Sequence, residues 1–404
     1  MRNKITWKFA LMQTLYWSSV CVVYAFSEHL LKSVGFRTDQ IGIILAATHI
    51  ASLLLQPILA SVADRTTGPS LRAILCGAVA GIILFSLGML FTESIPILFA
   101  VLFAVLSALS LAIQPLLNAV GFLYINRGEP LDYSFGRGIA SIGYAVFVYL
   151  FGRLADFGNH VLVLAFLAFH VLLLAFLFYF VPKRQSTNTA EDKAKAPRTL
   201  GAVLKEHPHF VLLLLGTLFL FVSHNFLNSY MLSIMNAIGG GTKEMSNAIS
   251  IAACLEVPTM LLFGLLLKRC SVRKLLRFSV VAFALKMFLT WFVVYRHASV
   301  PYLYVVQTLQ LFAYALFVPA SSYYANTVLG EADSAKAQML VTAGISCGCV
   351  TSLLLGGFGI EHLGVGTSLL LCAISAVLGM ILIFISTGWY QRKQRKGQNS
   401  NDED

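Results

Sequence analysis

About twelve long apolar stretches follow one another along this chain, and the sequence between them is mostly short and polar. A helix needs about 20 apolar residues to cross a hydrocarbon core about 30 Å thick. Runs such as those from Val211 to Val222 and from Leu369 to Ile385 are too long and too poor in charge for the core of a water-soluble domain. The pattern predicts an all-α polytopic membrane protein with 12 transmembrane helices.

The expected spans fall into two groups of six. They are 8–32, 39–63, 70–92, 96–125, 134–155 and 159–182, then 208–238, 244–268, 274–296, 299–328, 334–359 and 364–388. Between the groups lies the polar segment QSTNTAEDKAKAPRT, whose composition is typical of a flexible linker. We therefore expect an N-terminal half at 1–182, a cytoplasmic linker at 183–207, a C-terminal half at 208–390 and a cytoplasmic tail at 391–404.

The net charge of +11 is explained by where the basic residues lie. If spans are counted from the N-terminus, the basic clusters before the first span, in the linker, after Leu267 and in the tail all fall on one side of the membrane. This positive-inside bias predicts cytoplasmic N and C termini in the cell membrane. No basic surface is left over for nucleic acid, which we exclude as a partner.

Enzymatic motifs are absent from the sequence. It contains no phosphate-binding Walker loop, no GxSxG nucleophile elbow and no HExxH zinc motif. We expect no enzyme, no cofactor and no metal site. A receptor or scaffold would need a folded soluble module, and the longest loop is too short and polar to form one.

Three segments carry a resemblance to a known family. The segment 42–66, with Asp64 and Arg65 at its end, resembles helix two and the signature loop of major facilitator transporters. FGRGIASIGY at 135–144 resembles helix five of the branch that contains lactose permease and nucleoside symporters, and LEVPTM at 255–260 resembles its helix eight. The resemblance implies two six-helix halves related by a parallel repeat. It also implies a monomeric symporter that moves a sugar, glycoside or nucleoside by alternating access.

By this resemblance, Arg137 and Tyr144 contact the substrate. A guanidinium donates two parallel hydrogen bonds to neighbouring hydroxyls, and the aromatic ring two turns later on the same helix face stacks on a sugar. The alternatives are that Arg137 is an interfacial residue within reach of Asp132 and Glu129, and that Tyr144 is an ordinary core aromatic.

Several expected lining residues are neutral where the branch has charges. Asn118 stands where the branch places an acid paired with the helix-five Arg. His224, Asn225 and Asn228 form one polar stripe, and the resemblance makes the two asparagines replacements for acids. Gln307 stands where the branch has a lysine that balances those acids. The acids and the lysine are thus both replaced by neutral residues, and the net charge of the region stays the same.

Coupling to protons must also differ from the branch. Gln310 and Ala313 replace a His and Glu pair that couples proton movement to sugar, and neither side chain titrates near neutral pH. Glu256 in mid-span is the expected substrate acceptor and proton site, with Lys286 as its ion-pair partner. The alternatives are an uncoupled facilitator and an exporter of amphipathic compounds or drugs, which the many Phe residues would serve.

Two further pairs of charged residues lie near helix ends. We expect Asp64 and Arg65 to act in a cytoplasmic gate rather than in substrate binding, because they lie where helix two meets its loop. We expect Glu28 and His29, near the outer end of helix one, to reach out to the membrane interface.

Overall fold

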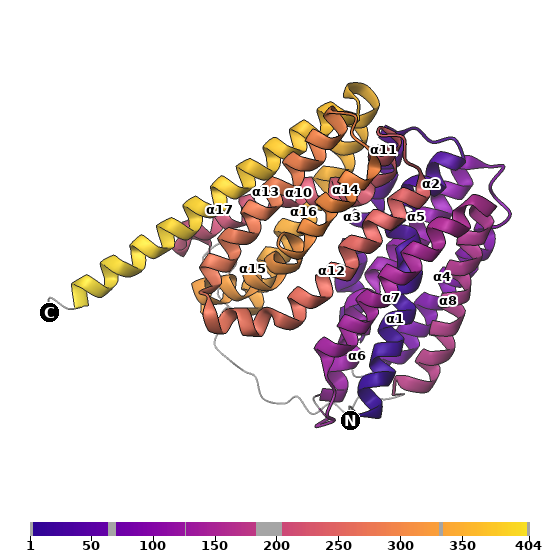
Figure 1. Ribbon diagram of the computed structural model, residues 1–404. Coiled ribbons are helices and arrows are strands. Elements are labelled where there is room, and N and C mark those ends of the chain that lie inside the picture. The colour runs from indigo at the N-terminus through magenta and orange to yellow at the C-terminus, as the bar shows by residue number, and fades with distance from the viewer. Residues whose placement is uncertain (1–2, 64–69, 126, 183–203, 331–333, 402–404) are drawn as a thin grey trace. The chain divides into compact units, whose positions relative to one another are not determined.

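The protein is a bundle of long helices (Figure 1). The computed structural model describes residues 3–63, 70–125, 127–182, 204–330 and 334–401. Helices suit this chain because hydrocarbon offers no partner to a backbone N–H or C=O group, so these groups must pair within the segment. The helices are α1 (Lys4–Ala25), α2 (Ser27–Ser33), α3 (Thr38–Ala63), α4 (Leu71–Met89), α5 (Pro96–Ala112), α6 (Gln114–Ile125), α7 (Tyr133–Leu154), η1 (Ala155–Phe157), α8 (Asn159–Phe180), α10 (Pro208–Ser229), α11 (Met231–Asn236), α12 (Thr242–Arg269), α13 (Val272–Tyr295), α14 (Val300–Gln307), η2 (Thr308–Leu311), α15 (Tyr314–Leu329), α16 (Ser334–Leu363) and α17 (Val365–Asn401).

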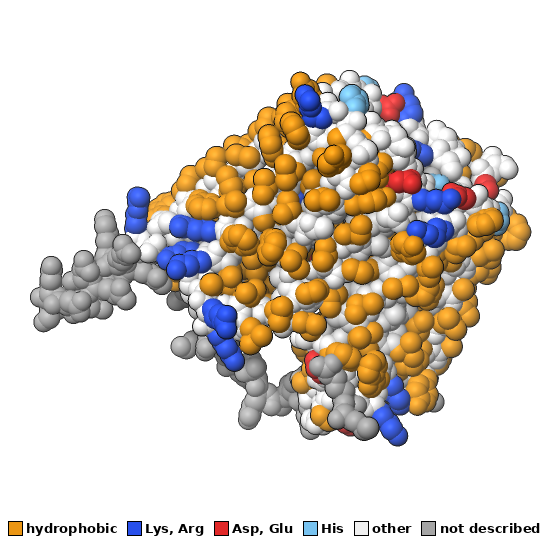
Figure 2. Space-filling view, viewed as in Figure 1, with side chains coloured by type: hydrophobic (Ala, Val, Ile, Leu, Met, Phe, Trp, Pro, Cys, Tyr) orange, Lys and Arg blue, Asp and Glu red, His pale blue; other side chains and the backbone are white. Residues whose placement is uncertain are grey.

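The predicted multi-pass architecture is confirmed. Within the described residues, 10 helices are long and apolar enough to cross a membrane, and up to 12 spans result if each of two bent helix pairs counts as one. Large apolar side chains such as Leu84 and Leu54 are 66% and 65% exposed, as expected of a surface that faces lipid. Figure 2 shows hydrophobic side chains along the sides of the helices and most charged side chains near their ends.

Four expected spans contain a break or a bend. In the span expected at 244–268, the parts Thr242–Thr259 and Leu261–Arg269 of α12 meet with a bend of 51°. α1 and α2 meet at Phe26 with a bend of 51°. α5 and α6 meet at Ile113, next to Pro115, which has no N–H to continue the helical ladder. The span expected at 299–328 is interrupted by the 3-10 turn η2, a feature that often marks a functional position in a helix.

The chain forms two compact units. Unit 1 contains residues 1–190 and 228–257, and unit 2 contains residues 191–227 and 258–404. These bounds differ from the predicted halves because residues 228–257 cluster with unit 1, so the division at 182 and 208 stays a prediction. The predicted linker lies almost wholly outside the described residues.

In unit 1, α1 packs along α7 and α8, α4 packs against α5 and α8, and α3 packs against α5. Glycines bring α1 and α7 close together. A Cβ atom at Gly143 would lie 2.6 Å from Cγ2 of Thr14, and one at Gly136 would lie 2.5 Å from the ring of Phe9. Small residues allow such close helix packing in membranes, where van der Waals contact drives association.

The helices of unit 2 also pack closely at glycines. α13 lies against α15 and α17, and α16 lies against the same two helices. A Cβ atom at Gly348 of α16 would lie 2.6 Å from the carbonyl oxygen of Leu218 in α10. The first and fifth helices of each predicted half, α1 with α7 and α10 with α16, therefore approach each other at glycines. This agreement supports the predicted parallel repeat.

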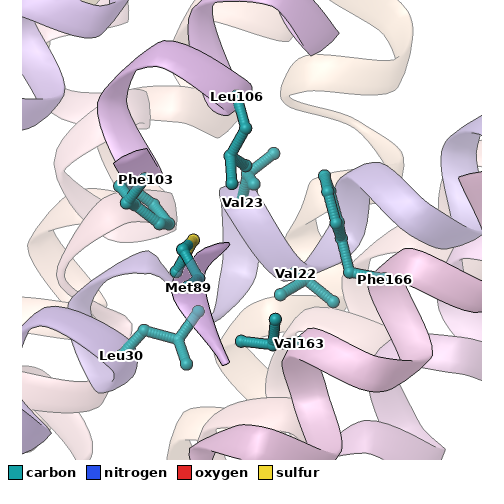
Figure 3. A pocket seen from close by; sticks show the side chains of 8 residues that line it. All are labelled: Val22, Val23, Leu30, Met89, Phe103, Leu106, Val163 and Phe166. Carbon is teal, nitrogen blue, oxygen red and sulfur yellow. The ribbon is translucent and has the colours of Figure 1, made fainter. Parts of the chain in front are cut away.

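A small apolar cavity lies in the core of unit 1 (Figure 3). Its volume is only about 10 Å³, and every side chain that lines it is apolar. A buried water needs polar partners as well as space, so this cavity is a packing defect rather than a ligand site. The lining residues are Val22, Val23, Leu30, Met89, Phe103, Leu106, Val163 and Phe166.

Candidate functional site

A polar cluster in unit 1 surrounds Arg137. The side chain of Asp132 caps α7 by accepting a hydrogen bond from the backbone N–H of Phe135 at 2.9 Å, which sets where the helix begins. Arg137 follows one turn later, and its Nη1 donates to Oδ1 of Asn118 at 3.5 Å. Gln13 of α1 donates to the same oxygen at 3.2 Å. The amide oxygen of Asn118 thus accepts from both side chains.

Aromatic rings extend this cluster. The guanidinium of Arg137 lies 5.0 Å from the centre of the Trp17 ring, a cation–π distance. Tyr144 meets Trp17 edge to face at 6.2 Å, and Tyr24 stacks on Trp17 at 6.4 Å. The structure therefore brings three predicted residues, Asn118, Arg137 and Tyr144, to one place around Trp17.

The chemistry of this cluster is that of a hydroxyl-binding site. In the described part of the chain, the contact with Asn118 is the one hydrogen bond that the half-buried guanidinium makes. Its remaining N–H groups can donate to a ligand, and its planar fork suits two adjacent hydroxyls. The ring of Tyr144, on the same face of α7, offers an apolar surface beside it.

A second cluster, in unit 2, surrounds Lys286. Lys286 of α13 is only 3% exposed, and its Nζ donates to Oε1 of Gln310 at 2.6 Å. The η2 turn carries Gln310, so the break in the span sets the position of this amide. His224 of α10 stacks on Tyr314 with ring centres 4.5 Å apart, and Phe283 of α13 meets His224 edge to face at 5.6 Å.

Two other predicted residues lie in unit 2. Asn225 donates to the backbone oxygen of Cys349 at 3.3 Å, which ties α10 to α16. Gln307 is 1% exposed, and within the described residues its Nε2 atom has no hydrogen-bond partner. Buried amide donors usually find a partner, so Gln307 is a candidate to bind a ligand.

The remaining predicted residues are divided between the units or lie outside the described residues. Asn228 and Glu256 belong to unit 1, where Asn228 is exposed and Glu256 is half-buried. Glu256 and Lys286 lie in different units, so their pairing stays a prediction. Asp64 and Arg65 lie outside the described residues.

Sequence reasoning missed Gln13 and Trp17. They lie four residues apart on α1 and so share one face of the helix. That spacing was the available signal, but α1 contains polar and aromatic residues on several faces, and the pair does not stand out among them.

The expectation for Glu28 was wrong. Glu28 is 1% exposed instead of reaching the membrane interface. The bend at Phe26 directs α2 towards α11, where the backbone N–H of Ser233 donates to Glu28 at 3.2 Å and its hydroxyl donates to the same carboxylate. Lys32 completes an ion pair with Glu28 at 2.8 Å. A buried carboxylate with these partners is stable where an isolated one would not be.

Further contacts within unit 1 join α2 and η1 to the start of α12. Nδ1 of His29 lies 3.1 Å from the hydroxyl of Thr242, and Lys243 pairs with Asp156 at 2.5 Å. These contacts and those of Glu28 form what we call the α2–α11 latch. It comprises Glu28, His29, Lys32, Asp156, Ser233, Thr242 and Lys243.

Known proteins resemble the whole chain. A maltose permease of Geobacillus stearothermophilus is 26% identical over 368 residues, which are 89% of this chain and 88% of the permease. A mutant of the nucleoside transporter NupG superposes with a TM-score of 0.79 at 14% identity, over 95% of this chain and 100% of the other. A D-xylose-proton symporter gives a TM-score of 0.71 at 14% identity, over 94% and 96%. At such low identity the two structures show the fold alone.

The sequence match to a family is equally extensive. The model of the MFS_1 like family matches residues 6–371, most of the described helices and both candidate clusters. Its members are transporters, so the protein is a transporter rather than an enzyme, and the resemblance seen in the three sequence segments is confirmed. The chain belongs to the MFS_1 like family of the major facilitator superfamily.

Proposed function

We propose that this protein is a secondary transporter that moves a small polar solute rich in hydroxyl groups across the cell membrane. The favoured solutes are a sugar, a glycoside or a nucleoside. The observation that carries this proposal is the Arg137 cluster, where a half-buried guanidinium lies over Trp17 beside the amides of Asn118 and Gln13. A fork of N–H donors next to an aromatic face suits a ring that carries hydroxyls.

The names of similar proteins support this solute class. One is a maltose permease, one a nucleoside transporter and one a D-xylose-proton symporter. Each of the corresponding solutes carries adjacent hydroxyl groups on a ring, which is the chemistry that the Arg137 cluster offers.

We further propose transport by alternating access, with cytoplasmic termini. The α2–α11 latch holds α2 against α11 within unit 1. Asp64 and Arg65 are the proposed cytoplasmic gate. Replacing Asp64 with Asn should slow transport while equilibrium affinity stays within about threefold, because a gate biases conformations without touching substrate. Loss of binding with normal exchange kinetics would reject this role.

Proton coupling through Glu256 is the third part of the proposal. A mid-membrane carboxylate that meets Lys286 in one conformation and not in another could take up and release a proton. One observation favours an uncoupled facilitator instead. Gln310, at the position that titrates in the branch, is engaged by Lys286 and cannot itself carry a proton.

Uptake into proteoliposomes tests the solute class and the coupling together. Maltose, other sugars, nucleosides and cationic dyes would be offered with and without an imposed pH gradient. Saturable uptake of a sugar or a nucleoside, abolished in Arg137→Ala, is the expected result. Transport of dyes alone would replace the proposal by the exporter of amphipathic compounds.

The coupling residue is tested by Glu256→Gln. Accumulation driven by the pH gradient should be lost, while equilibrative exchange should remain within about threefold of wild type. If the variant still accumulates solute against its gradient, Glu256 is not the coupling residue. If the wild type shows exchange but no gradient-driven accumulation, the protein is an uncoupled facilitator.

A further inference from the structure

A groove lies between α7 and the first half of α12, entirely within unit 1. Its volume is about 560 Å³, which is within the range of small-molecule sites. α7 contributes Val146, Tyr149 and Leu150, and α12 contributes Ile251 and Cys254. Apolar side chains dominate the lining. α7 lies in a candidate membrane span and α12 is one of the two bent helix pairs that can each count as one span, so we expect the groove at hydrocarbon depth.

The two helices are held together at the groove by direct backbone approach. The hydroxyl of Ser250 donates to the carbonyl oxygen of Ala145, so this polar group is already used. A Cβ atom at Gly152 would lie 1.8 Å from Oγ of Ser246, which shows how closely α7 and α12 pack just beyond the groove. The groove therefore lies beside a region where α7 and α12 pack tightly.

The groove faces away from the proposed substrate cluster. At about 100° per residue, Tyr149 lies about 140° around α7 from Tyr144. Val146, Tyr149 and Leu150 are all more than 40% exposed, as expected of side chains on the lipid-facing side. A polar solute bound at Arg137 would not reach this face.

A positive charge lies at one end of the groove. Arg153 is four residues beyond Tyr149, on the same side of α7, and its guanidinium lies 3.4 Å from the centre of the Tyr149 ring. Nη1 of Arg153 donates to the carbonyl oxygen of Tyr149 at 2.9 Å and to Oδ1 of Asn247 at 3.3 Å. In the described part of the chain these are the hydrogen bonds that Arg153 makes, so Nε and Nη2 can still donate.

Arg153 makes no ion pair within the described part of the chain. The neighbouring Lys243 pairs with Asp156 at 2.5 Å. Arg153 also lies in the last turn of α7, where the helix dipole favours a cation. The dipole does not neutralise the guanidinium, which can still bind an external anion.

We propose that this groove binds an anionic phospholipid, with an acyl chain between α7 and α12 and the phosphate on Arg153. The distance along α7 from Val146 to Arg153 is about 10 Å at 1.5 Å per residue, which places the cation at the headgroup level when the groove lies in hydrocarbon. Tyr149 lies at the boundary between the hydrocarbon and the headgroup level, where aromatic rings are enriched in membrane proteins. The lipid would bridge two helices that belong to different predicted halves.

Native mass spectrometry of the purified full chain tests the proposal. Phosphatidylglycerol and phosphatidylcholine with identical acyl chains would be titrated separately, and the retained lipid counted. Phosphatidylglycerol should be retained about fivefold more tightly at one site, the factor that corresponds to about 1 kcal/mol for one basic residue near a headgroup.

Two variants separate the headgroup from the acyl chain. Arg153→Gln should abolish the preference for phosphatidylglycerol while retention of either lipid persists. Cys254→Phe should fill the groove and remove the site for both lipids. Matched controls are Arg72→Gln, which removes an Arg placed over Phe178 at 5.1 Å, and Leu172→Phe on the exposed side of α8.

The controls should retain the wild-type stoichiometry and preference. Equal retention of both lipids by the wild-type protein, or an unchanged preference in Arg153→Gln, would overturn the headgroup assignment. Unchanged retention in Cys254→Phe, with circular dichroism and melting temperature as in wild type, would overturn the groove. Displacement of the lipid by a transported dye would show that the groove serves a solute instead.

Discussion

The Arg137 cluster of unit 1 and the Lys286 cluster of unit 2 use the same ingredients in different ways. Each joins one cation to one carboxamide oxygen beside aromatic rings. The guanidinium of Arg137 is half-buried and its contact with Asn118 is long, at 3.5 Å. Lys286 is 3% exposed and its contact with Gln310 is short, at 2.6 Å.

The difference assigns different roles to the two cations. A loosely held, delocalised guanidinium can exchange its partner for a ligand hydroxyl at little cost. A buried ammonium at membrane depth is costly without a polar partner, so the partners that Lys286 has in each conformation set the stability and the conformational balance of its surroundings. We therefore expect Arg137 to govern affinity and Lys286 to govern turnover.

The largest expected effect is that of Arg137→Lys. One ammonium cannot reproduce the paired donation of the fork, and hydrogen bonds to charged groups contribute about 2 kcal/mol. Substrate affinity, measured by equilibrium binding to the purified protein, should fall about thirtyfold. Wild-type affinity in this variant would make Arg137 an interfacial anchor and remove the contrast with Lys286.

Replacing Lys286 with Met tests the other side of the comparison. The variant removes the charge and leaves the amide of Gln310 without this donor, which should shift the balance of conformations by about 1 to 3 kcal/mol. Turnover should fall about tenfold in proteoliposomes, while binding affinity changes less than about threefold. A loss of affinity as large as that of Arg137→Lys would place Lys286 in direct contact with substrate.

Tyr144 tests whether the ring or its hydroxyl matters in the Arg137 cluster. An aromatic contact contributes about 1 kcal/mol beyond its buried area, so Tyr144→Ala should lower affinity about fivefold. Tyr144→Phe keeps the ring that meets Trp17 and should lower affinity less than about twofold. Equal losses in both variants, measured by titration calorimetry, would mean that the hydroxyl binds substrate.

The smallest effect is expected from Asn118→Asp, which should hold the cation of the first cluster as tightly as the second cluster holds Lys286. A carboxylate should hold the guanidinium of Arg137 in a charge-assisted contact shorter than the present 3.5 Å. We expect a rise of a few degrees in melting temperature and about a threefold loss of affinity. A gain in affinity would show that the guanidinium works best when it is fixed.

The spans were predictable because the bilayer allows few alternatives. A backbone in hydrocarbon must be helical, so a long apolar run without charges fixes both the type and the approximate ends of an element. Pro115 removes one hydrogen bond from the ladder at the break between α5 and α6, but Pro57 and Pro319 lie inside continuous helices, so a proline alone did not predict this break. The bend at Phe26 and the η2 turn at Gln310 have no such local cause in the chain.

Within the candidate site, the sequence predicted Arg137, Tyr144 and Asn118 but missed Gln13 and Trp17. Arg137, Tyr144 and Asn118 carry a motif or an unusual polar position, and the structure brings them together. Trp17 was missed because an aromatic on a largely apolar helix looks like any lipid-facing residue. Glu28 was misplaced because its burial depends on Ser233, about 200 residues later in the chain, a distance that no local pattern can report.

The length of α17 has a consequence for the edge of the molecule. Its 37 residues correspond to about 55 Å, whereas the hydrocarbon core is about 30 Å thick. Even with a strong tilt, several turns of this helix must extend beyond the hydrocarbon into water. The sequence at that end carries the basic run from Arg392 to Lys396. A reporter protein attached at this end would be held at a distance from the lipid headgroups by a helical spacer that the chain itself provides.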